Sequence, residues 1–118
     1  MEITQSIDDG IVCIALAGRM DTAGVAGVEA RFYASLGKPG SGTAIDLSQV
    51  TMLTSMGIRL LVASARTARA KGSRVVLVAP TGAVREVLDN GGIGEIIPIA
   101  DDRAAARAAL RGADGAGR

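Results

Sequence analysis

Apolar residues recur along the chain with two different periods, and these periods define the expected elements. Short runs rich in Val and Ile predict strands, whereas longer segments with an apolar residue every three or four positions predict helices. An Asp-Gly pair at 9–10 separates the first two runs and favours a hairpin. The expected strands cover residues 4–7, 11–17, 43–47, 74–79 and 95–99.

Four helices are expected between and after these strands, each bounded by capping or breaking residues. They span about 22–36, 55–71, 81–89 and 103–110, and residues 48–54 are expected to form a polar loop. The apolar residues expected to face inward on the first helix are Val25, Val28, Phe32 and Leu36. On the second helix they are Ile58, Leu61, Val62, Ala65 and Ala68, with Arg59, Arg66 and Ala70 on the opposite side.

The order of elements, ββαβαβαβα, defines the fold class as α/β. After the opening hairpin, alternation of strands and helices implies right-handed crossovers and a mixed, mostly parallel sheet with helices packed against it. A chain of 118 residues has room for one core. We therefore expect a single domain over residues 1–111 and a flexible C-terminal tail over 112–118.

Composition excludes several classes of function. Only 2% of residues are aromatic and the net charge is +1, which argues against a nucleic-acid partner. The chain has no histidine, and its single cysteine, Cys13, lies in an apolar run, so we expect a buried thiol, no metal, no cofactor and no enzymatic activity. There is no basic, apolar signal at the N-terminus and no apolar run of roughly 20 residues, so the expected location is the cytoplasm, away from membranes.

The segment around residues 46–61 is the most informative for chemistry. In α/β sheets, sites gather where strands end at their carboxyl edge, and Thr54 and Ser55 stand there at a helix start. A phosphate at this position would meet free backbone N–H groups and the positive end of the helix dipole. Gly57 costs roughly 1 kcal/mol of helix propensity, and its expected benefit is an open first turn. A plain Ser or Thr cap with a tolerated glycine remains the alternative.

The same segment resembles the signature of STAS domains, in particular that of bacterial anti-sigma factor antagonists. The resemblance lies in Asp46-Leu47-Ser48 at a strand end, followed by Leu53-Thr54-Ser55-Met56-Gly57-Ile58. It extends over nearly the whole chain, through the corner Gly18-Arg19-Met20-Asp21, the turn and strand at Gly72 and 74–79, and Leu88 with Gly91-Gly92-Ile93.

The resemblance implies a partner switch controlled at Ser55, which falls on the family's phospho-acceptor. The unmodified protein would bind an ATP-dependent serine kinase that is also an anti-sigma factor and so free the sigma factor. Phosphorylation would separate the pair, and a serine phosphatase would reset it. Thr54 stands where the family usually has Asp, which makes Thr54 a competing acceptor and puts kinase recognition in question.

The expected partner-binding surface combines the acceptor with an apolar spot made by Met56 and Leu60, four residues apart. Asp21 is expected to cap the first helix, and it could also orient the hydroxyl of Ser55. The residues predicted for this surface are Asp21, Thr54, Ser55, Met56, Gly57, Arg59 and Leu60.

Two other functions stay open at this stage. STAS domains also occur as adaptors in stress-signalling assemblies and with transporters, without a phosphorylation cycle. Some family members bind nucleotides, so weak nucleotide binding near Ser55 is a third option. The segment 90–94 is better explained as a helix C-cap and turn than as a nucleotide loop. Arg103, Arg107 and Arg111 are expected to form a solvated helix face.

Overall fold

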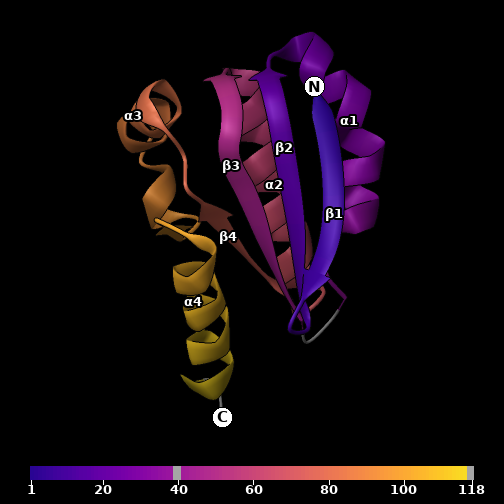
Figure 1. Cartoon of the computed structure of the whole chain (residues 1–118), viewed down its shortest axis with the longest axis vertical. Coiled ribbons are helices and arrows are strands. Elements are labelled where there is room, and N and C mark those ends of the chain that lie inside the picture. The colour runs from indigo at the N-terminus through magenta and orange to yellow at the C-terminus, as the bar shows by residue number, and fades with distance from the viewer. Residues whose placement is uncertain (39–40, 117–118) are drawn as a thin grey trace.

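The computed structural model describes residues 1–38 and 41–116, and the side chains up to residue 111 (Figure 1). The elements are β1 (Glu2–Asp8), β2 (Ile11–Met20), α1 (Thr22–Ser35), β3 (Gly42–Leu53), α2 (Ser55–Ala70), β4 (Arg74–Val78), α3 (Gly82–Asn90), the short 3-10 helix η1 (Ile93–Glu95), β5 (Ile99–Ala100) and α4 (Arg103–Ala116). The predicted order ββαβαβαβα is confirmed.

The sheet has five strands in the order β1-β2-β3-β4-β5, so chain neighbours are also sheet neighbours. The β1–β2 pair is antiparallel, and the other three pairs are parallel. The hairpin turn is formed by Asp9 and Gly10. Both have positive φ, which a two-residue turn needs if it is to match the twist of the strands that it joins. The mixed, mostly parallel α/β sheet expected from the sequence is therefore present.

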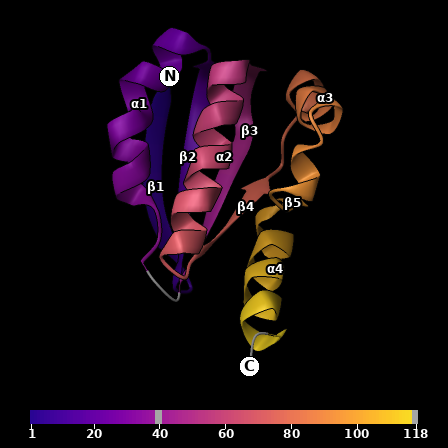
Figure 2. The ribbon, with the colours of Figure 1, turned by 180° about the vertical axis from the view of Figure 1, so that it is seen from behind.

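Helices cover the two faces of the sheet unequally. Figure 2 shows α1 and α2 side by side over β1, β2 and β3, whereas α4 lies beside β4 on the other face. The larger core lies under α1 and α2 and includes Phe32, Leu61 and Leu77, with Leu88 added from α3. In the smaller core, Cys13 and other buried apolar residues of the sheet pack with Ala106 and Leu110 of α4. The expectation of a buried thiol at Cys13 is confirmed.

The predicted polar loop at 48–54 is wrong, because β3 continues to Leu53. The strand persists since β2 also runs on to Met20 and pairs with β3 as far as Met20↔Leu53, with register shifts that let the two strands bend together. Val50 and Leu53 are buried within this extension. Backbone pairing and burial thus override the polar composition of the segment.

The last strand is shorter than the predicted 95–99. Residues Ile93–Glu95 form η1, and β5 comprises only Ile99 and Ala100. Pro98 has no N–H to donate to a neighbouring strand, so the ladder begins after it. The preceding segment 90–94 is a helix end and turn as expected: α3 ends at Asn90, and Gly92 adopts the left-handed conformation.

The inward face of α2 is rotated from the predicted stripe. The buried residues are Gly57, Leu60, Leu61, Ser64 and Ala68. Ile58, Val62 and Ala65 are only half-buried, whereas Arg59, Arg66 and Ala70 are exposed as expected. The small residues Gly57 and Ser64 let the helix approach the sheet closely, and sequence periodicity alone gives them no weight.

Of the arginines predicted for a solvated face of α4, Arg103 and Arg111 are exposed and Arg107 is half-buried, but all three also form ion pairs that the sequence did not predict. Arg103, Arg107 and Arg111 pair with Asp46, Asp8 and Asp9, so the arginine row ties the last helix to β3 and to the β1–β2 turn. The helix also continues to Ala116, past the predicted end at Leu110. Of the predicted tail 112–118, residues 117 and 118 lie outside the described residues, and its flexibility stays a prediction.

Candidate functional site

The carboxyl ends of β2 and β3 meet at one edge of the sheet, and a single carbonyl joins them. Met20, which is fully buried, pairs with Leu53. Its carbonyl oxygen accepts two hydrogen bonds from Thr54, one from the backbone N–H at 3.2 Å and one from the hydroxyl at 2.7 Å. The chain leaving β3 toward α2 is therefore fixed against the chain leaving β2 toward α1.

Ser55 is the first residue of α2 and its side chain is exposed. Thr54 precedes it as the N-cap residue but makes no side-chain cap, and its hydroxyl instead donates to Met20. The first turn of α2 also contains no acidic residue. The early N–H groups of the helix and its positive dipole end are thus left for water or an added anion.

The hydroxyl of Thr54 is not equivalent to that of Ser55. It is half-buried and engaged with a backbone carbonyl, which disfavours Thr54 as a competing phospho-acceptor. Ser55 is the hydroxyl of this pair that faces solvent.

Two glycines, each at the third position of its helix, set how closely the helices approach this edge. A Cβ on Gly24 of α1 would lie 2.0 Å from the backbone oxygen of Arg19. A Cβ on Gly57 of α2 would lie 2.6 Å from Leu53 Cδ1 and 2.9 Å from Met20 Cβ. Gly57 therefore serves close packing onto the ends of β2 and β3, and the interpretation of an open first turn is wrong.

Asp21 caps α1, as predicted from the sequence. One carboxylate oxygen accepts the N–H of Gly24 at 2.9 Å, and the other pairs with Arg19 Nε at 3.1 Å. The Gly24 hydrogen bond, with the help of Arg19, lowers the pKa of Asp21. Both oxygens have partners, and no hydrogen bond to Ser55 is present among the described residues. The role of Asp21 in orienting that hydroxyl stays a prediction.

The remaining residues predicted for the partner-binding surface divide into two groups. Arg59 is exposed and Met56 is half-buried, so both remain accessible beside Ser55. Leu60 is 3% exposed and belongs to the main core, as Gly57 belongs to the buried face of α2. The apolar spot predicted from Met56 and Leu60 is therefore wrong, because the helix is rotated so that Leu60 faces the sheet.

Asp46, part of the motif Asp46-Leu47-Ser48, has a structural role that the sequence did not predict. Its carboxylate accepts the N–H of Ser48 at 2.8 Å and pairs with Arg103 of α4 at 3.0 Å. Burial raises the pKa of Asp46, but hydrogen bonds from Ser48 and the pair with Arg103 outweigh it, so the pKa lies below the usual 3.8. Asp46 thus fixes α4 to β3. The sequence feature that could have indicated this contact is the row of arginines spaced four residues apart on α4, which includes Arg103.

The lowered pKa of Asp46 predicts a pH-dependent contribution to stability. A carboxyl with a lowered folded pKa stabilises above its unfolded pKa, and the contribution is lost as pH falls through the folded value. Asp46→Asn should therefore lower the free energy of unfolding by about 1 kcal/mol near neutral pH, since the pair is partly exposed. The difference from wild type should shrink below the usual pKa of 3.8. Urea unfolding at several pH values measures it.

Asp101→Asn is the matched control for this prediction. Asp101 pairs with Arg85, but its side chain is 85% exposed, so the substitution should change stability by less than about 0.5 kcal/mol. Equal effects of the two substitutions at every pH would contradict the role assigned to Asp46.

The profile of the STAS domain family matches residues 2–106. A protein of Bordetella bronchiseptica described as "Putative anti-sigma factor antagonist BtrV" is 30% identical over 111 residues, which cover 94% of this chain and 96% of that protein. The chain therefore belongs to the STAS domain family, as its sequence resemblance indicated.

Solved structures share the fold over nearly the whole chain. An anti-sigma factor antagonist from Mycobacterium paratuberculosis superposes with a TM-score of 0.84 at 23% identity, covering 93% of each chain. The anti-sigma factor antagonist SpoIIAA in its unphosphorylated form gives 0.74 at 20% identity, covering 94% of this chain and 97% of that one. SpoIIAA of Bacillus in its phosphorylated form gives 0.63 at 20% identity, covering 90% and 97%.

Within residues 1–38 and 41–116, no helix combines the length and apolar character needed to cross a membrane. The same residues hold no group of three or more acidic or Cys side chains arranged to bind a metal ion.

Proposed function

We propose that this protein is an anti-sigma factor antagonist whose binding to a serine-kinase anti-sigma factor is switched off by phosphorylation at Ser55. The unmodified form binds the kinase and frees the sigma factor. Transfer of the γ-phosphoryl group of ATP to the hydroxyl of Ser55 then separates the pair. A serine phosphatase restores the unmodified form.

The observation that carries the proposal is the position of Ser55 as an exposed hydroxyl at an uncapped helix start. A phosphate there gains about 0.3–1 kcal/mol from the helix dipole and up to about 2 kcal/mol in favourable geometry. The modification is therefore compatible with the folded state. It would act on the partner by adding charge to the docking surface. Family membership and the names of the relatives support the same assignment.

Site mapping after incubation with ATP and the switch-type serine kinase of the source organism tests the proposal. Wild type should gain one phosphate on Ser55, and Ser55→Ala should gain none. Thr54→Val keeps the size of Thr54 without its hydroxyl, and it should still gain the phosphate, because the Thr54 hydroxyl is bound to Met20. Intact mass and peptide mapping give the result.

Two outcomes would contradict the proposal in different ways. Phosphate on Thr54 of the wild type would mean that the bond to Met20 opens readily and that the acceptor is misassigned. No phosphate on wild type, despite measurable binding to the kinase, would remove the switch and favour a constitutive adaptor.

A further inference from the structure

The edge of β4 is paired with a strand along only half of its length, and the unpaired half (the open edge) carries an inference independent of Ser55. Side chains around this half leave Val75 only 5% exposed. β5 pairs with Leu77 and Val78 alone, so Arg74–Val76 have no partner strand on that side within the described residues. The N–H groups of Leu77 and Ala79 donate to Pro98 and Ala100 on this edge. Because backbone groups alternate in direction along a strand, the N–H and C=O of Val75 point the same way.

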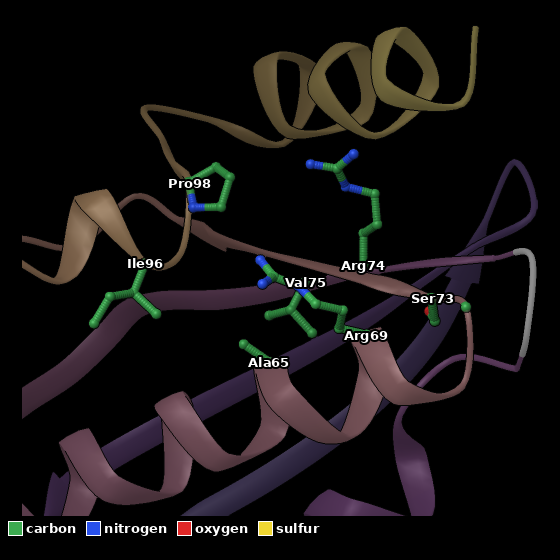
Figure 3. Close-up of a pocket in the computed structure, with 8 residues that line it drawn as sticks. Ala65, Arg69, Ser73, Arg74, Val75, Ile96 and Pro98 are labelled. Carbon is green, nitrogen blue, oxygen red and sulfur yellow. The ribbon is translucent and has the colours of Figure 1, made fainter. Parts of the chain in front are cut away.

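Pro98 explains why β5 does not extend further along this edge of β4. In the register observed, the carbonyl of Val75 would need the N–H of residue 98, which proline lacks. The chain before it turns away into η1. The result is a cavity of about 370 Å³ beside the edge, bounded by Ala65 of α2, Val75, Ile96 and Pro98 (Figure 3). Ile96 is 49% exposed, although it is a large apolar residue.

Two arginines flank this cavity from opposite sides of the strand. Arg69 comes from α2, which lies on the face with Val75 and Leu77. Arg74 alternates with Val75, so it belongs to the face of Val76 and α4. Figure 3 shows Arg74 pointing toward α4 and Arg69 reaching from α2 toward Val75. Successive side chains of an added strand point to opposite faces, so two neighbouring residues can meet the two guanidinium groups.

The charge around the edge defines the complementary ligand. Neither arginine forms an ion pair with another described residue, and the cavity lining includes no acidic residue. The sequence of α2 also contains no Asp or Glu. A second copy pairing through the same edge would bring like charges together, which is unfavourable.

We infer that the open edge of β4 binds an extended segment of a partner protein, with two successive acidic residues, as an added strand. The segment lies along Arg74–Val76, about 10 Å of strand, and gains backbone hydrogen bonds to the N–H and C=O of Val75. One acidic side chain pairs with Arg69 and the next with Arg74, while an apolar neighbour covers Ile96. Ser55 lies at the other end of α2, about 21 Å away for 14 residues of helix, so this contact is independent of the switch.

The test uses the capped hexapeptide Thr-Val-Asp-Glu-Val-Thr and a capped neutral version with Asn-Gln in place of Asp-Glu. Titration of the labelled full chain by NMR should shift the amide signals of Arg74, Val75 and Ile96 with the acidic peptide. At saturation the Val75 amide should exchange with solvent at least about tenfold more slowly, because it gains a hydrogen-bond partner. The neutral peptide should bind at least about tenfold more weakly.

Variants of the chain separate the edge from general charge. The double substitution Arg69→Glu and Arg74→Glu should weaken the acidic peptide at least about tenfold. Arg66→Glu makes one such charge reversal, half the charge change of the double substitution, on an exposed position of α2 outside this cavity and should leave the affinity within about twofold. Ser55→Glu should also leave it unchanged, which keeps this test separate from that of the switch. Circular dichroism confirms that each variant is folded.

Three results would overturn the inference. The first is equal binding of the acidic and neutral peptides. The second is no protection of the Val75 amide at about 5 mM acidic peptide, in which case Arg69 and Arg74 serve only to keep edges of separate molecules apart. The third is inorganic phosphate binding as tightly as the acidic peptide, which would make the cavity a simple anion site.

Discussion

Gly24→Ala should destabilise the protein by about 2–4 kcal/mol, a large effect for the addition of one methyl group. The added Cβ would lie 2.0 Å from the carbonyl oxygen of Arg19 and 3.2 Å from the capping oxygen of Asp21. Backbone cannot swing aside as a flexible side chain can, so α1 must lift from the end of β2. The lift also weakens the Asp21 cap, which by itself contributes about 1 kcal/mol. Urea unfolding followed by circular dichroism measures the change.

Gly27→Ala is the matched control, three residues further along the same helix. Gly27 is exposed, and a Cβ there meets nothing within 4 Å. The substitution should therefore stabilise the protein by about 0.5–1 kcal/mol through helix propensity. If both substitutions stabilise the protein, the close approach of α1 to Arg19 is not a feature of the molecule in solution.

Phosphorylation of Ser55 should lower the affinity for the anti-sigma factor about a hundredfold, which corresponds to about 2.7 kcal/mol. The phosphate adds about −1.5 to −2 charge to an exposed position flanked by Met56 and Arg59. Docking would then require desolvation of that charge, while the fold beneath it stays fixed by the bonds between Thr54 and Met20. Calorimetric titration of unmodified and phosphorylated protein with the anti-sigma factor measures the ratio.

Control variants distinguish an effect of negative charge at Ser55 on binding from a general effect of added negative charge. Ser55→Ala should bind like the unmodified protein, and Ser55→Glu should lose part of the affinity. Ser6→Glu puts a charge on the exposed part of β1 near the hairpin, at the far end of the sheet, and should have no effect. Equal affinity of the phosphorylated and unmodified forms would refute the switch, even if Ser55 is the acceptor.

The sequence allowed the fold class, the element order and the helix cap at Asp21 to be predicted, because each depends on local signals. These signals are Asp-Gly at the hairpin, Asp before the first helix, and Pro or Gly at the ends of elements. Each determines the backbone conformation of only the few residues around it. The extension of β3 to Leu53 could not be predicted in this way, since it depends on pairing with β2. The same holds for the rotation of α2, where two small residues select the buried face only when the sheet beneath them is known.

The candidate site was predicted in position but not in detail. Ser55 lies at the helix start that motif and spacing indicated, and it is exposed. The occupied hydroxyl of Thr54 depends on a contact with Met20, 34 residues earlier in the chain. The burial of Leu60 depends on packing against the core. The pairing of the α4 arginines with Asp8, Asp9 and Asp46 is equally long-range.

The arginine row of α4 connects this helix to the β1–β2 hairpin, far away in the sequence, and this has a consequence for synthesis. Arg107 pairs with Asp8, 99 residues earlier, and Ala106 and Leu110 cover a face that includes Ile11 and Cys13. Those apolar residues emerge from the ribosome well before the helix that shelters them. Until then the nascent chain presents an uncovered sheet face, so chaperones and premature termination should affect this protein chiefly through its second core.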